Sequence, residues 1–242
     1  MKKRSFSSFF VFLLLAVFAV GGCHRASGVT TQGGPDKGAA FKRIAVLPFQ
    51  DLSPDEYAAL AVAAKVPISS LKGESSPGVP ARIVQDLFWE RLAAKGHFDL
   101  VSTDRTAGIL SQVIHTDGNM GLPEGMVRIG RQLEADGVLV GYVYRFRERK
   151  GYDYGVEKPA SVAFEVQLFR CRDGDLVWKA TFDKTQTSLM ENMLQISNFV
   201  KDRGRWITAR ELAAEGVEEV LKRFPVPAPQ SSSTPKEKVL QE

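Results

Sequence analysis

Residues 136–146 read DGVLVGYVYRF, and this stretch decides the fold. Its first half is apolar almost without interruption, a pattern typical of a strand that is buried on both faces of a sheet. A helical pattern through Val127, Ile129 and Leu133 precedes it directly. Strands that alternate with helices in this way build largely parallel sheets. We therefore predict a central strand at residues 136–146, around which the remaining strands assemble.

The sequence that follows predicts an antiparallel hairpin. Apolar residues alternate with others in SVAFEVQLFRC (161–171) and again in LVWKATF (176–182), and the intervening RDGD supplies a turn. One face of this hairpin is apolar. The opposite face carries polar side chains, namely those of Glu165, Gln167, Lys179 and Asp183. We expect this polar face to lie in water.

The rest of the chain supplies further strands and helices. Short apolar runs predict strands at 44–47 and 98–102. Capping boxes and helical periodicity predict helices between Ser53 and Pro67, at 80–95, at 103–114, from 188 to about 199 and from 208 to 224. Glycines, prolines and serines predict a loop at 66–79.

These elements predict a single α/β domain with some α+β character. We expect a three-layer type of architecture, in which helices pack on a mixed sheet of about five strands. The carboxy-terminal part of this domain is the antiparallel hairpin, followed by two helices.

The amino terminus predicts a lipoprotein signal peptide. Lys2, Lys3 and Arg4 precede a 12-residue apolar run at 9–20, which is shorter than the roughly 20 residues that span a bilayer. Two glycines and Cys23 follow, and this ending resembles the lipobox of bacterial lipoproteins. The resemblance implies that Cys23 receives a diacylglyceryl group and, after cleavage, an acyl chain such as palmitate on its amino group. The alternative is an ordinary secreted protein that is cut after Gly21.

The predicted organisation has four parts. Residues 1–22 form the signal peptide, and 23–41 form a lipid-anchored flexible tether rich in Gly, Ser and Thr. Residues 42–224 form the α/β domain. Residues 225–242 begin rich in Pro and Ser and end in charged residues, which predicts a disordered tail.

The charge of the chain does not indicate a nucleic-acid partner. The formal net charge of +4 comes from 32 basic against 28 acidic residues, and three of the basic ones lie in the signal peptide. The mature chain is therefore close to neutral, whereas nucleic-acid binding calls for a clustered basic face. With Cys23 lipidated, Cys171 is the only remaining thiol, so no disulfide forms within one chain, and a structural role for Cys171 is favoured over redox chemistry.

No motif in the sequence predicts catalysis. The three histidines lack metal-ligand spacing, the glycines of DGNMGLPEG lack a P-loop ending, and Gly-x-Ser-x-Gly is absent. His115 with Asp117 is the sharpest catalytic candidate, but polar residues that close a helix explain the pair better. We therefore expect no catalytic, cofactor-binding or metal-binding residues, no cofactor, and a protein that is not an enzyme.

Aromatic residues close to arginines mark the candidate partner surface. Its members are Tyr142, Tyr144, Tyr152, Tyr154 and Trp206. Aromatic side chains beside basic ones bind ligands by stacking. The alternative is that 142–154 is simply a strand that runs out to a solvated edge.

Several segments resemble a known family. KRIAVLPFQDLS (42–53), RLAAKGHFDLVS (91–102) and IGRQLEADGVLVGYV (129–143), with the hairpin RDGDLVWKATF (172–182), resemble the domain of the curli secretion-channel (CsgG-like) lipoproteins. The amino-terminal domain of TolB and the lipoproteins that activate peptidoglycan synthases share this domain. The loop and helix at 51–79 are long for the synthase activators, and no hairpin suited to a membrane channel is present.

The resemblance implies a lipid-anchored, non-enzymatic cell-envelope protein that binds or positions a protein partner. Residence at the periplasmic face of the outer membrane is implied too, because His24 stands where an Asp would retain relatives in the inner membrane. One alternative is a subunit of an oligomeric secretion or surface-assembly complex, in which the chain is a homo-oligomer. A second alternative is an envelope hydrolase.

Overall fold

The computed structural model describes residues 28–32, 41–63, 65–72, 78–152, 155–186 and 206–225. The predicted signal peptide, Cys23, His24, Tyr154, the helix predicted from 188 and nearly all of the predicted tail lie outside these ranges. Within the ranges, no helix combines the length and apolar character needed to cross a bilayer.

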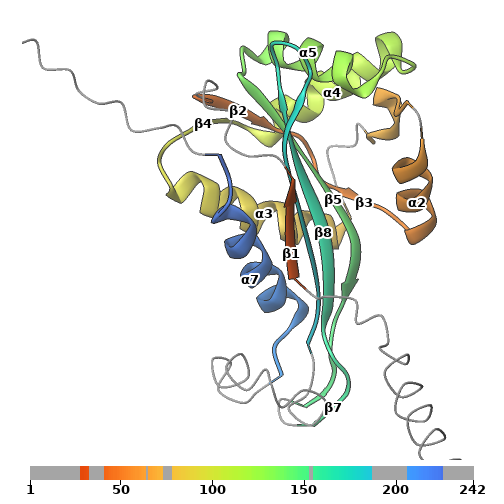
Figure 1. Cartoon of the computed structure of the whole chain (residues 1–242), viewed down its shortest axis with the longest axis vertical. Coiled ribbons are helices and arrows are strands. Elements are labelled where there is room, and N and C mark those ends of the chain that lie inside the picture. The colour runs from red at the N-terminus through yellow and green to blue at the C-terminus, as the bar shows by residue number, and fades with distance from the viewer. Residues whose placement is uncertain are drawn as a thin grey trace, which may run out of the picture.

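The centre of the molecule is an open, mixed sheet of seven strands (Figure 1). The strand order is β1-β9-β8-β5-β2-β4, and β3 also pairs with β5. Its strands are β1 (Gly28–Gln32), β2 (Arg43–Val46), β3 (Gln50–Asp51), β4 (Asp99–Val101), β5 (Gly137–Arg147), β8 (Ser161–Arg170) and β9 (Leu176–Thr185). A separate hairpin joins β6 (Lys150–Tyr152) to β7 (Gly155–Lys158). The mixed α/β fold predicted from the sequence is confirmed, with more strands than the five expected.

Helices cover both faces of this sheet. The helices are α2 (Pro54–Val62), α3 (Val79–Ala94), α4 (Thr103–Asp117), α5 (Leu122–Leu133) and α7 (Ala209–Leu221), with a short 3-10 helix η1 (Ile68–Ser70). Side chains of α3 and α7 share one hydrophobic core with the sheet, and those of α4, α5 and η1 share a second core on the other face. Figure 1 shows α3 and α7 on one side of the strands.

The central position of β5 is confirmed, because it pairs parallel with β2 and β3 and antiparallel with β8. Val138, Leu139 and Val140 are fully buried, as the continuous apolar run predicts. The interruption between β2 and β3 coincides with Pro48, which has no amide hydrogen for the ladder. After Pro48 the ring of Phe49 lies directly over Gly141, where a Cβ atom would come within 2.3 Å of Phe49 Cδ2.

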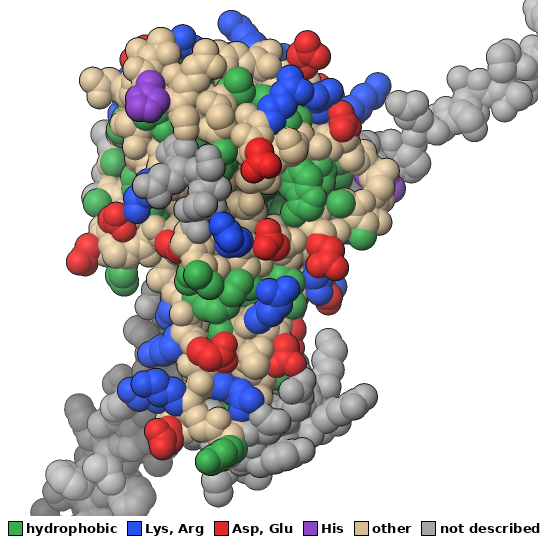
Figure 2. Space-filling model, turned by 180° about the vertical axis from the view of Figure 1, so that it is seen from behind, with side chains coloured by type: hydrophobic (Ala, Val, Ile, Leu, Met, Phe, Trp, Pro, Cys, Tyr) green, Lys and Arg blue, Asp and Glu red, His purple; other side chains and the backbone are tan. Residues whose placement is uncertain are grey.

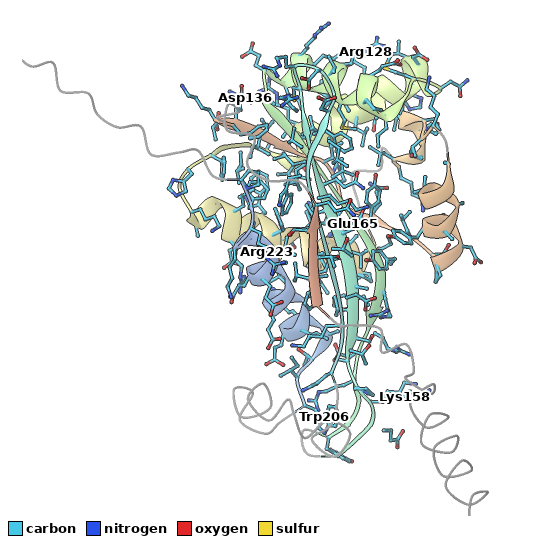
Figure 3. The ribbon with its side chains drawn as sticks, viewed as in Figure 1. Arg128, Asp136, Lys158, Glu165, Trp206 and Arg223 are labelled. Carbon is cyan, nitrogen blue, oxygen red and sulfur yellow. The ribbon has the colours of Figure 1, made fainter. Side chains whose placement is uncertain are left out.

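Asp136 fixes the start of β5 to its neighbours. One carboxylate oxygen, Oδ2, accepts hydrogen bonds from the backbone N–H groups of Lys42 and Arg43, both at 2.9 Å (Figure 3). The backbone carbonyl of Asp136 accepts from the N–H of Cys171. The turn between α5 and β5 is tight, and Glu134 closes the helix in the left-handed conformation with φ of 53°.

Part of the predicted tether is a strand. Residues 28–32 form β1, which pairs antiparallel with β9 at the edge of the sheet. Val29 packs against the core, and its carbonyl accepts a hydrogen bond from Arg223 Nη1. The sequence GVTTQ offers little apolar content to reveal this strand. It forms because a neighbouring edge distant in sequence is available to pair with it.

The predicted loop at 66–79 is anchored in the body of the protein. Ile68 and Leu71 are buried in the second core. The side-chain amide of Gln50 holds the loop, since its Oε1 accepts from the N–H of Lys72 at 2.9 Å and its Nε2 donates to the carbonyl of Pro48 at 2.7 Å. The first half of the loop therefore forms a fixed wall beside the sheet.

The expectation that the polar hairpin face lies in water is wrong for its centre. Glu165 is only 2% exposed, and the neighbouring Ala163 is fully buried. Helix α2 and the start of α5 lie over this part of the sheet and share a cavity with Glu165. A strand pattern alone does not show this cover, because α2 is distant in sequence.

Candidate binding cavity

A cavity of about 230 Å³ lies between the sheet, α2 and the start of α5. The described residues that line it come from five elements and the segment after α2. They are Tyr57, Leu60, Val66, Leu122, Tyr142, Glu165, Gln167 and Lys179. Figure 3 labels Glu165 in the middle of the sheet. The floor is polar, and the walls are aromatic and aliphatic.

The strand register brings the floor residues together. Tyr142 of β5 lies opposite Glu165 of β8, and Gln167 of β8 lies opposite Lys179 of β9. Side chains at alternate positions of neighbouring strands project from the same face of a sheet. The same alternation that predicts the hairpin therefore gathers an acid, a base, an amide and a phenol on one face.

The Glu165 carboxylate contacts three donors. Oε2 lies 2.8 Å from Lys179 Nζ and accepts a hydrogen bond from Thr181 Oγ1 at 3.2 Å. Oε1 accepts from Gln167 Nε2 at 2.6 Å. A buried carboxylate without such partners would be strongly destabilising. The floor of the cavity is thus a neutral, hydrogen-bonded ion pair, of which the lysine is the more exposed member.

Tyr142, which lines the cavity, and Tyr144, at its edge, stay protonated at neutral pH. Burial, and then the negative charge of Glu165, raise the pKa of Tyr142 above its ordinary value. Burial, and then Tyr57, also raise the pKa of Tyr144. The rings of Tyr57 and Tyr144 stack with centroids 4.5 Å apart, which fastens α2 to the outer half of β5. Both side chains therefore contribute neutral aromatic packing: Tyr142 is buried in the second core, and Tyr144 stacks on Tyr57.

The lining of the cavity offers both polar and apolar contacts. Glu165 can accept and Lys179 can donate a hydrogen bond, while Leu60 and Tyr57 offer apolar surface. A side chain with an apolar body and a neutral polar end matches both the apolar wall and the polar floor of the cavity. Within the described ranges, no three residues among His, Cys, Asp and Glu lie close enough to hold a metal ion.

The structure divides the partner surface predicted from the sequence into two places. Tyr142 lines the cavity, and Tyr144 packs on Tyr57 at its edge. Tyr152 is 86% exposed in the β6–β7 hairpin, and the partly exposed Trp206 lies at the same end of the molecule (Figure 3). Tyr154 lies outside the described residues. The set is therefore not one continuous surface.

The remaining sequence candidates lie away from the cavity. His115 and Asp117 are exposed in the last turn of α4. Cys171 is buried against Gly130, and burial, with Asp136 as a second cause, raises the pKa of its thiol to about 12. The thiol is therefore protonated at neutral pH and serves packing.

Sequence reasoning missed the residues that form the floor. Glu165 and Lys179 look like water-facing residues of a hairpin, because each alternates with apolar neighbours. The available signal was that their strands place them almost opposite each other with opposite charge. That signal indicates a pair, but it does not reveal the helix that covers the pair.

Replacing Lys179 by Met is expected to lower the free energy of unfolding by about 1–3 kcal/mol, because Glu165 would keep a buried charge without its cation. Solvent at the partly exposed lysine keeps the loss below that of a fully buried pair. Adding Glu165→Gln to Lys179→Met should recover more than half of the loss. Urea unfolding of the single and double variants measures both values, and additive losses would contradict a coupled pair.

No protein-family model matches the chain, and no curated protein matches it. Among solved structures, the PelC dodecamer from Paraburkholderia phytofirmans matches at 15% identity with a TM-score of 0.46, over 84% of this chain and 100% of that one. The LpoB C-terminal domain from Salmonella enterica matches at 16% identity with a TM-score of 0.36, over 62% and 87%. Lipoprotein GNA1162 from Neisseria meningitidis matches at 11% identity with a TM-score of 0.31, over 67% and 98%.

These likenesses are too distant to carry an argument about activity. Each is below 25% identical to this chain and has a TM-score below 0.5, so none of them supports an assignment of family or role. Similarity to the curli secretion-channel family in particular is not shown by them.

Proposed function

We propose that this protein is a lipid-anchored, non-enzymatic binding protein of the bacterial cell envelope, which holds a protein partner through the cavity beneath α2. The observation that carries the proposal is the hydrogen-bonded pair of Glu165 and Lys179 on the floor of a cavity with aromatic and aliphatic walls. The anchor is the lipid on Cys23, and the periplasmic face of the outer membrane is its site.

The ion pair of Glu165 and Lys179 supports a binding role for the cavity over a catalytic one. Three donors already hold the Glu165 carboxylate in a fixed orientation, and it keeps acceptor capacity for one further hydrogen bond. A nucleophile needs an activating base, and the phenol of Tyr142 has a pKa raised above its ordinary value. The groups that converge here are arranged to orient a polar group.

The size of the cavity supports one side chain as its occupant. A volume of about 230 Å³ is below the range typical of pockets for drug-sized ligands. A partner's loop that inserts one glutamine, tyrosine or tryptophan would place its apolar part between Tyr57 and Leu60. Its polar end would exchange hydrogen bonds with Lys179 and Glu165.

Site-specific photocrosslinking in cells tests this function. A photoreactive benzophenone amino acid at Leu60, which lines the cavity, is expected to give one protein adduct that Lys179→Met reduces at least several-fold. The matched control places the same amino acid at Ala59, an exposed neighbour on α2 outside the cavity lining.

The adduct's mass separates the candidate functions. An adduct with a different protein supports the proposal, and an adduct of twice the mass of this chain would favour the oligomeric assembly instead. Equal adducts from Leu60 and Ala59, or none from Leu60, would contradict a role for the cavity.

A further inference from the structure

The direction of β1 sets where the lipid anchor leaves the domain. Gly28 pairs with Asp183 and Gln32 with Lys179, so the amino-terminal end of β1 points toward the β6–β7 hairpin. Figure 1 shows this hairpin as an extension of β5 and β8 beyond the helices. We call the described residues of the hairpin, 150–152 and 155–158, the tip.

Chain length then fixes how far the anchor can lie from the tip. Gly28 is level with Arg145 across β9 and β8, and Tyr152 is seven residues beyond Arg145, or about 23 Å along an extended strand. Cys23 precedes Gly28 by five residues, which span at most about 18 Å. While β1 is paired, Cys23 therefore lies at most about 18 Å from Gly28, whose end of the strand faces the tip. A sheet that stands upright on the bilayer brings the tip to the depth of the headgroups.

The tip carries side chains suited to a membrane surface. Tyr152 is 86% exposed, and tyrosine is enriched at the boundary between lipid and water. Lys150 and Lys158 lie directly opposite each other across the hairpin, and both are exposed. Like charges in this position destabilise a hairpin, so an anion between them would stabilise it.

Acidic residues next to the tip are already paired. Glu148 accepts hydrogen bonds from the N–H of Ala209 at the start of α7, and Asp183 pairs with Arg145. Figure 2 shows Lys and Arg side chains together with acidic ones around the narrow end of the molecule, and a hydrophobic side chain at its extremity. Within the tip, Glu157 is also exposed, so its described residues carry two lysines against one acidic side chain.

We propose that the tip docks on the bilayer that holds the anchor, with Tyr152 at headgroup level and Lys150 and Lys158 against the phosphates of anionic lipids. This inference rests on the lipid at Cys23 in the proposed function. It adds the orientation of the domain, which stands on its tip with α4 and α5 farthest from the membrane. Neither the cavity nor its partner is needed for this contact.

Spin-label depth measurements on the full lipidated chain test the proposal. The protein is purified from membranes and placed in vesicles of phosphatidylethanolamine and phosphatidylglycerol, with a nitroxide on Tyr152→Cys. The matched control carries the label on Arg131→Cys, exposed in α5 at the other end of the sheet. Cys171 should not react, because its thiol is buried and its pKa is raised to about 12.

The label at 152 is expected to be accessible to oxygen and shielded from an aqueous nickel complex, with the opposite result at 131. Reversing the charge of both lysines, as Lys150→Glu with Lys158→Glu, should lower the ratio of membrane-immersed to water-exposed label at position 152 roughly tenfold. Removing phosphatidylglycerol should act in the same direction. An unchanged ratio in both tests would overturn the contact between the lysines and phosphate.

Vesicle flotation on the same samples separates the two proposals. Protein that floats while the label at 152 is as exposed to water as the label at 131 overturns the docked tip and leaves the anchor standing. Protein that does not float overturns the lipid anchor, and the docked tip with it.

Discussion

Replacing Trp178 by Ala is expected to lower the free energy of unfolding by about 3–5 kcal/mol, the upper end of what truncating one buried side chain costs. Trp178 projects from β9 into the core beneath α3 and α7 and is only 1% exposed. Its ring meets Phe224, just after α7, edge-on with centroids 4.9 Å apart. Alanine would remove this contact and leave a cavity between the sheet and the last helix.

Urea unfolding followed by circular dichroism measures the loss, and Trp178→Phe is the matched control. Among the described residues, the buried indole Nε1 has no hydrogen-bond partner. Phenylalanine would therefore keep most of the apolar contact and lose no hydrogen bond, so a cost below about 1.5 kcal/mol is expected. Equal losses for the alanine and phenylalanine variants would show that the indole N–H matters and contradict the packing argument.

Substituting Gly141 is expected to destabilise the centre of the sheet. A Cβ atom at this position would lie 2.3, 2.4 and 2.5 Å from three ring atoms of Phe49, which is itself 1% exposed and packed near Phe88. The ring has no free space to move into, so Gly141→Ala should cost about 1–3 kcal/mol and Gly141→Val more.

A second glycine provides a control of opposite sign. Gly108 lies within α4, and a Cβ atom there would meet nothing within 4 Å. Gly108→Ala should therefore raise the free energy of unfolding by about 0.5–1 kcal/mol, because alanine is the better helix former. A loss of stability at 108, or none at 141, in the same urea titration would contradict this account.

The sequence predicts those helices and strands whose pattern of apolar residues lies within the element itself. The apolar run of β5 and the alternation of β8 and β9 each contain their own signal, and capping boxes at Ser53 and Thr208 begin α2 and α7 where expected. Such patterns depend on which face of each element is buried. They do not depend on which distant segment covers it.

The elements that sequence reasoning missed depend on distant partners. The strand β1 is polar and becomes a strand only because β9, about 150 residues later, presents an edge. The alternation of β8 predicts that Glu165 faces water, whereas α2 covers it with Tyr57 and Leu60. The candidate site can thus be predicted only in part: the sequence indicates Tyr142 and Tyr144 as candidate surface residues, but it does not indicate the ion pair beside them.

The pairing of β1 also determines how the protein would carry mechanical force. If Cys23 is held in the bilayer and a partner draws the domain away, tension runs along β1, parallel to β9 and perpendicular to the hydrogen bonds of their ladder. The load then falls on all of these bonds together, as shear, and they resist better than bonds that are peeled one by one. Once the strand slips, residues 24–41 can extend to at most about 60 Å. Under tension, β1 would thus detach first, and the freed segment would lengthen before the force reaches the hydrophobic core.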